Sequence, residues 1–166
     1  MRFLRDLLGA SNPTSGWVRD PSRPLVLDLD TKSLSGVPLG APFDRLDFLG
    51  PARRSKYNRE IWEFSSLGVV AEEEDATVGS LFVVPIPDAN FGVEPYTGSV
   101  TIGGQPVSIS WITREEDVKR AFGKPTRRDE DPEETILFYE VDGRVEREIE
   151  LTPEGRIKTI AIYSYL

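Results

Sequence analysis

Alternating apolar and charged residues predict that β-strands form most of this chain. The clearest alternation spans residues 144–151, where Val145, Ile149 and Leu151 fall on one side of an extended backbone. A period of two is typical of a strand with one face against a core and the other in water. The water-facing side would then carry four charged residues: Arg144, Glu146, Glu148 and Glu150.

Short apolar runs bounded by turn residues predict the remaining strands. The turn signals include Gly103-Gly104 and Asp142-Gly143, which both favour tight hairpins. The expected strands are 25–30, 60–65, 69–72, 81–84, a hairpin over 100–111, 135–141 and 156–163.

Three segments have the spacing of short helices. Residues 42–49 begin with a proline and end at Gly50-Pro51, and residues 113–122 begin with a capping box formed by Thr113 and Glu116. The apolar residues within 3–8 also fall on one face of a helix, so we expect a short amphipathic helix near the N-terminus.

Two similar stretches of sequence follow the two internal helices. Residues 48–54 read Phe-Leu-Gly-Pro-Ala-Arg-Arg, and residues 121–128 read Ala-Phe-Gly-Lys-Pro-Thr-Arg-Arg. Each precedes an aromatic strand, a turn glycine and two more strands, which indicates a tandem repeat. We expect an α+β fold of two tandem units, each a short helix plus a mostly antiparallel β-meander, with the helices packed on one sheet face. The expected parts of this one compact domain are an N-terminal helix and connector at 1–24, unit 1 at 25–84, a linker at 85–98 and unit 2 at 99–166.

The composition narrows the chemistry that the chain can perform. It contains no Cys and no His, which excludes disulfides, thiolate or imidazole metal ligands and the commonest general base. Its net charge of −8 disfavours nucleic acid as a partner and permits a basic protein.

Because no motif for a nucleophile, cofactor or metal is present, we expect a protein that is not an enzyme and needs no cofactor. No apolar run could span a membrane and no secretion signal begins the chain, so we expect a cytoplasmic protein.

The aromatic strands of the two units suggest a binding surface. An offset of 74 residues superimposes Trp62 and Phe64 on Ile136 and Phe138, which predicts that all four face the core. Tyrosine among charged residues on the opposite sheet face is typical of a binding patch. An ordinary solvated sheet face is the alternative. The predicted binding residues are Ile61, Glu63, Leu137, Tyr139, Glu146, Glu148 and Glu150.

The paired arginines that recur in the two units are candidate anion contacts. Arg53 and Arg54 follow the first helix, and Arg127 and Arg128 follow the second. Guanidinium groups bind carboxylates and phosphates through paired hydrogen bonds. The alternative is a solvated loop in which these arginines pair with nearby acids such as Asp129.

The order of these motifs resembles a known tandem-repeat fold. The resemblance covers residues 25–166 and rests on Gly36-Val-Pro-Leu-Gly40, Leu49-Gly50-Pro51, Phe122-Gly123-Lys124-Pro125, Tyr139 and Gly143. The order of motifs is similar to that in the fold of the β-lactamase inhibitor protein and of the related small outer-membrane lipoprotein A unit. This resemblance implies helices packed behind a sheet whose open, concave face binds another protein.

The sequence therefore favours a non-enzymatic protein-interaction module, such as an immunity-type inhibitor that binds its partner through an exposed sheet face. The alternative is a small-molecule carrier or a structural domain, with an apolar pocket between helices and sheet.

Overall fold

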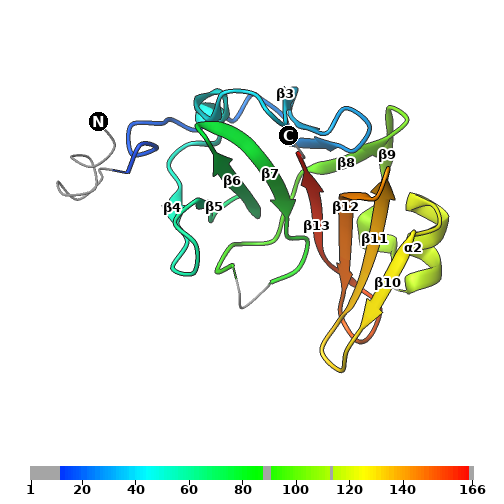
Figure 1. Ribbon diagram of the computed structural model, residues 1–166. Helices are drawn as coiled ribbons and strands as arrows, with labels where there is room; N and C mark the ends of the chain where they lie inside the picture. The colour runs from blue at the N-terminus through cyan, green and yellow to red at the C-terminus, as the bar shows by residue number, and fades with distance from the viewer. Residues whose placement is uncertain (1–11, 88–90, 113, 165–166) are drawn as a thin grey trace.

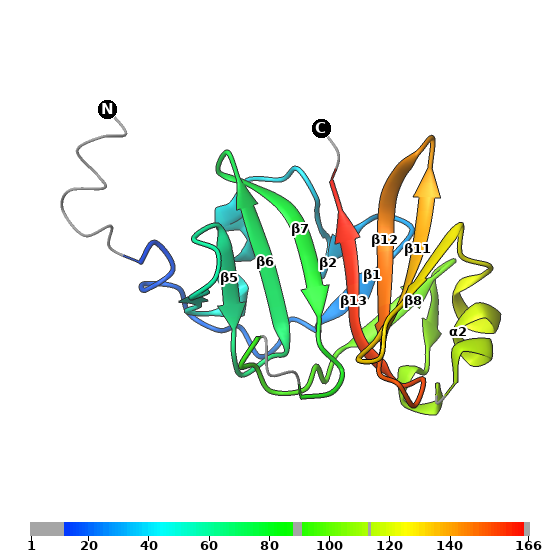
Figure 2. The same cartoon turned by 60° about the horizontal axis from the view of Figure 1, so that its bottom comes forward.

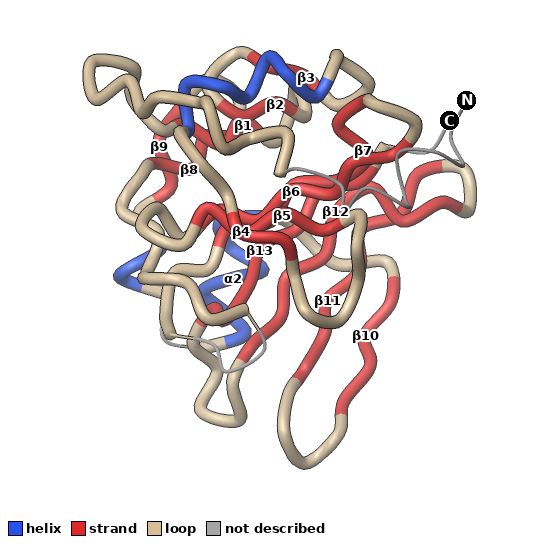
Figure 3. The backbone as a smooth tube through the Cα atoms, turned by 90° about the vertical axis from the view of Figure 1, so that its left-hand side faces the viewer, coloured by secondary structure: helices blue, strands red, loops and turns tan. Residues whose placement is uncertain are grey.

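Two β-sheets, one of eight strands and one of five, form the architecture (Figure 1). The computed structural model describes residues 12–87, 91–112 and 114–164. The predicted N-terminal helix at 3–8 and the capping residue Thr113 lie outside these residues. The side view in Figure 3 separates the two layers, with the small sheet on one side of the large one.

The large sheet is antiparallel throughout. Its strand order joins two four-stranded meanders at the centre, where β7 pairs with β13. The strands, in spatial order, are β10 (Arg127–Glu130), β11 (Thr135–Val141), β12 (Arg144–Leu151), β13 (Ile157–Tyr163), β7 (Thr77–Val83), β6 (Val69–Glu74), β5 (Ile61–Phe64) and β4 (Arg53–Arg54).

The small sheet mixes strands from both predicted units. Its strands, in spatial order, are β3 (Val37–Pro38), β2 (Ser33–Leu34), β1 (Val26–Asp28), β8 (Ser99–Ile102) and β9 (Gln105–Val107). β1 and β8 run parallel, and the other neighbours are antiparallel. Figure 2 shows this sheet lying behind β7, β13 and β12.

The expected α+β fold of two tandem units is wrong. The described residues contain one α-helix, α2 (Glu115–Phe122), and two 3-10 segments, η1 (Phe43–Leu49) and η2 (Ile109–Trp111). The first predicted helix forms as a 3-10 segment, which ends at Gly50, whose φ is +81°. Because the small sheet combines strands from both predicted units, neither unit is a self-contained helix plus meander. The fold is mainly antiparallel β.

One continuous core fills the space between the two sheets. Trp62, Leu81 and Ile160 come from the inner face of the large sheet, and Leu27 and Val100 come from the small sheet; all five are fully buried. The inner face is also covered by apolar side chains of η1 and α2. Burial of side chains of this size is the main stabilising contribution to such a fold, at about 1.5–3 kcal/mol each.

The opposite, outer face of the large sheet is partly covered by part of the predicted linker. The backbone N–H of Glu94 donates to the carbonyl of Ser65, and that of Tyr96 donates to the carbonyl of Val84, each at 2.7 Å. Val93 packs in a second apolar cluster with Val84 on this face. Residues 91–96 are therefore fastened across the ends of β5 and β7.

The fastening of this segment requires a glycine at position 68. Gly68 has a φ of +63°, and an added Cβ would overlap the backbone nitrogen of Tyr96. We predict that Gly68→Ala lowers the free energy of unfolding by about 3 kcal/mol or more, because the clash with backbone adds to the left-handed penalty. Urea denaturation measures the change.

Gly143→Ala is the matched control for this prediction. Gly143 has a φ of +75°, and an added Cβ would have no atom within 4 Å beyond its chain neighbours, so only the backbone penalty applies. That penalty is about 1–2 kcal/mol. Equal losses for the two variants would show that the contact with Tyr96 is not important for stability.

Candidate functional site

A row of directly paired residues crosses all eight strands on the outer face of the large sheet. Both ends of the row are arginines, and between them lie two glutamates, two phenylalanines and two smaller apolar residues. In spatial order the row is Arg53, Glu63, Val70, Phe82, Ala161, Glu148, Phe138 and Arg127. This face is the surface on which the sequence predicts a binding site.

At the β4 end of the row, Arg53 closes over Glu63. Arg53 Nε donates to Glu63 Oε2 at 2.9 Å, and its Nη2 makes a second contact with the same oxygen. Glu63 is only 2% exposed, and the carbonyl of Gly92 lies 3.5 Å from the same guanidinium. The predicted binding residue Glu63 therefore lies on the expected face but is covered by this chain itself.

At the β10 end, Arg127 covers Phe138. The guanidinium carbon of Arg127 lies 3.6 Å from the centre of the Phe138 ring, and Arg127 also pairs with Asp129 and Glu140. A cation over an aromatic face is stabilising, and here it shields an outward-facing ring from water. The sequence places Phe138 in the core, but this contact buries it on the outer face.

The second arginine of each pair points to the inner side. The guanidinium carbon of Arg54 lies 4.6 Å from the centre of the Trp62 ring. Arg128 donates hydrogen bonds from Nε to Glu115 Oε1 at 3.1 Å and from Nη1 to Glu130 Oε2 at 2.7 Å. All four arginines of the two pairs are thus held by rings or carboxylates of this chain. An external anion would have to displace these contacts, which favours the alternative interpretation that the arginines are structural.

Leu137 and Tyr139 lie on the inner face, so their assignment to the exposed face is wrong. Leu137 is fully buried, and the Tyr139 hydroxyl donates to the carbonyl of Gly123 at 3.1 Å. Burial raises the pKa of Tyr139. The register explains the error: Arg54 pairs with Trp62, and Arg128 pairs with Leu137, so the correct strand offset is one residue longer than expected. A one-residue shift reverses the faces of a strand.

The three glutamates of β12 do not share one surface. A register shift between Tyr139 and Glu140 interrupts the alternation, and Glu146 pairs with Lys32 of the small sheet at 2.5 Å. Glu150 does lie on the outer face, where Lys158 is 3.7 Å away. Ile61 is also on the outer face and partly exposed, as expected.

A patch of partly exposed aromatic rings at the centre of the outer face was missed by sequence reasoning. Phe82 lies 5.9 Å from Phe91 and 5.9 Å from Tyr163, with the Tyr163 ring perpendicular to it. Phe82 and Tyr163 come from the two strands that meet at the middle of the sheet. The sequence shows their alternation within each strand but does not reveal that these strands are neighbours. We call Phe82, Phe91, Tyr163, Glu72 and Glu148 the central patch.

Glu148 is the half-buried carboxylate of the central patch. The Tyr163 hydroxyl donates to Glu148 Oε2 at 2.8 Å. Partial burial raises the pKa of Glu148, and the bond from Tyr163 only partly opposes this shift. Its ionised form is therefore incompletely solvated, and an added cation would stabilise it.

A hollow of about 330 Å³ adjoins the central patch beside Tyr163. Its walls carry the carboxylates of Glu60, Glu72 and Glu74, together with Ser80, whose hydroxyl donates to Glu72. Within the part of the chain that the structure describes, no lysine or arginine forms an ion pair with these three glutamates. The described residues also contain no group of three or more acidic side chains arranged to hold a metal ion.

Comparisons with known proteins identify no relative. No family model matches the chain, and neither does any curated protein or solved structure. The likeness to the β-lactamase inhibitor fold therefore stays a prediction. Among the described residues, no helix has the length and apolar character needed to cross a membrane.

The raised pKa of Glu148 gives a pH dependence whose sign can be tested. Because the native pKa is above the usual value of 4.5, the native state binds more protons than the unfolded state between the two values. The stabilising contribution is complete below the unfolded pKa and is lost as the pH rises through the native pKa. We compare the free energy of unfolding of the wild type with that of Glu148→Gln. We expect the wild type's advantage to fall as the pH rises above the usual glutamate pKa of 4.5. The fall should be roughly 1 kcal/mol or less, since solvent screens a partly exposed carboxylate.

Chemical denaturation at several pH values measures this difference. Glu133→Gln is the control, because Glu133 is an exposed glutamate of the loop between β10 and β11. A flat or rising difference for Glu148→Gln would contradict the desolvation of Glu148.

Proposed function

We propose that this chain is a non-enzymatic protein-interaction module that binds a basic partner protein through the central patch. The observation that carries the proposal is the position of three partly exposed aromatic rings beside carboxylates that no lysine or arginine of the described residues pairs with. Aromatic side chains at the middle of an interface commonly provide most of the binding energy. Here Phe82 and Tyr163 stand on the antiparallel sheet, and Phe91 packs against Phe82 from the segment that crosses the sheet.

The charge distribution around the patch favours a basic partner. Glu148 lies on one side of the rings, and the hollow lined by Glu60, Glu72 and Glu74 lies on the other. The whole chain also carries a net charge of −8. Such complementarity accelerates association with a basic protein and disfavours acidic ones. A lysine or arginine of the partner could place its charge near the carboxylates and its stem on the rings.

Packing on the inner face supports this proposal over the carrier alternative. That alternative needs an apolar pocket between a helix and the sheet. In the structure, Val118 and Phe122 of α2 are buried in the same core as Leu137. These side chains fill the space that a carried apolar ligand would need.

The proposal is tested by charge reversal at the central patch. We predict that Glu72→Lys and Glu148→Lys each weaken binding of a basic partner by about tenfold, since each removes an attraction and adds a repulsion. The partner is first captured from the native host with the tagged wild-type chain. Its affinity for each folded variant is then measured in low and in high salt, because binding carried by charge weakens as salt rises.

Glu133→Lys is the matched control and should leave the affinity within about twofold. Amide hydrogen exchange of the complex should show protection on β7, β12 and β13. A partner whose affinity is unchanged by both central substitutions, or one that protects the small sheet instead, would contradict the proposal.

A further inference from the structure

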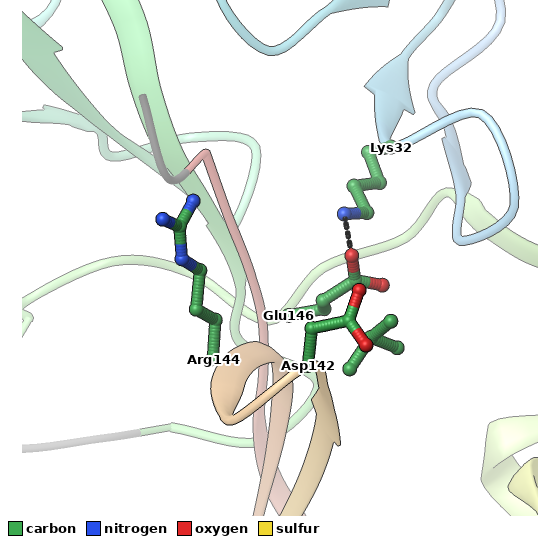
Figure 4. Close-up of a pocket in the computed structure, with 5 residues that line it drawn as sticks. Lys32, Asp142, Arg144 and Glu146 are labelled. Atoms are coloured by element: carbon green, nitrogen blue, oxygen red, sulfur yellow. Dashed lines mark hydrogen bonds and ion pairs between the residues drawn. The ribbon is translucent and has the colours of Figure 1, made fainter.

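A second hollow lies between the two sheets, away from the central patch (Figure 4). It measures about 420 Å³, within the usual range of ligand sites of about 300–1,000 Å³. The small sheet contributes Lys32, and the hairpin between β11 and β12 contributes the remaining wall. These hairpin residues are Val141, Asp142, Arg144 and Glu146.

The backbone at this hollow holds two residues in an uncommon conformation. Lys32 has a φ of +47° in the turn between β1 and β2, and Asp142 has a φ of +52° at the hairpin tip. Left-handed backbone is unfavourable for a residue with a Cβ. The turn at Lys32 brings its ammonium group to 2.5 Å from Glu146 Oε1, and this ion pair joins the two sheets across the hollow.

Beside this ion pair, one charged group of each sign has no partner among the described residues. The side chains of Asp142 and Arg144 are exposed, and neither side chain forms a hydrogen bond or ion pair with any residue that the structure describes. Figure 4 shows their side chains leaving the hairpin on different sides. Val141, which is 53% exposed, provides an apolar surface next to Asp142.

We propose that this hollow binds a small zwitterion with an aliphatic side chain, such as a short peptide. Its carboxylate would accept hydrogen bonds from the Arg144 guanidinium, and its ammonium group would donate to the Asp142 carboxylate. Its side chain would lie on Val141. Charge-assisted hydrogen bonds of this kind are the strong ones in ligand recognition.

The balance of charges selects this class of ligand over simple ions. A simple anion in the hollow would face the carboxylates of Asp142 and Glu146, which line its walls. A simple cation there would face Lys32 and Arg144. Only a molecule that carries both charges satisfies both groups. Because the two side chains leave the hairpin on different sides, a dipeptide suits them better than a single amino acid (Figure 4). This inference does not depend on the binding of a protein at the central patch.

The experiment titrates the full chain with valyl-valine and follows backbone amide signals by NMR. We expect a dissociation constant on the order of 1 mM, with shifts at the turn of Lys32 and at the β11–β12 hairpin. N-acetylated valyl-valine and valyl-valine amide each lack one charge and should bind at least about tenfold more weakly. Free valine tests whether a single amino acid is sufficient for binding, and it should bind more weakly than the dipeptide.

Two substitutions test the named contacts. Arg144→Gln and Asp142→Asn should each reduce valyl-valine affinity about tenfold. Asparagine tolerates the left-handed conformation at position 142, so the hairpin should fold normally. Arg45→Gln and Asp47→Asn, on exposed positions of η1, are the matched controls and should leave the affinity unchanged. The absence of specific shifts at saturating dipeptide, or equal binding of the blocked peptides, would overturn the proposal.

Discussion

The pairing of β7 with β13 at the centre of the large sheet is the constraint on which the rest of the structure depends. It sets Val83 opposite Ile160 and Leu81 opposite Ile162, and all four side chains are buried against the small sheet. The two strands are far apart in sequence, so their pairing must offset a substantial loss of chain entropy. Burial of these four apolar residues provides that compensation. The same pairing brings Phe82 and Tyr163 together on the other face, so the central patch exists only where the two meanders meet.

The edges of the large sheet explain why arginine pairs occur twice in the sequence. β4 and β10 are its terminal strands, and both carry exposed arginines. An edge strand offers unpaired backbone groups to other chains, and charged side chains discourage such pairing. Arg53 and Arg127 have a second effect, since each covers a side chain of the neighbouring strand. The similarity between the two stretches is therefore explained by equivalent positions at opposite edges.

Local features of the fold could be predicted, but features that depend on distant pairing could not. The Gly103-Gly104 and Asp142-Gly143 turns form the expected hairpins, because hairpin geometry is encoded by neighbouring residues. The sheet positions of Ile61, Glu148 and Glu150 also agree with the sequence pattern. The pattern assigns Leu137 and Tyr139 to the wrong face of the sheet. The offset between the two aromatic strands, β5 and β11, is one residue longer than the offset read from the sequence. Tertiary packing determines the register shift beside Glu140 and the contact between Lys32 and Glu146. The alternation of apolar and charged residues along one strand carries no information about such packing.

The central place of β13 has a consequence for how the chain is made. β13 follows all the other described strands in sequence, yet it fills the middle of the large sheet. At a synthesis rate of about 5–20 residues per second, the edge of β7 stays without its neighbour for several seconds after it is made. During that time Leu81 and Val83 belong to an open apolar edge that can pair with another nascent chain. The interval before β13 emerges is therefore the period in which this protein is most exposed to misassembly on the ribosome and most in need of a chaperone.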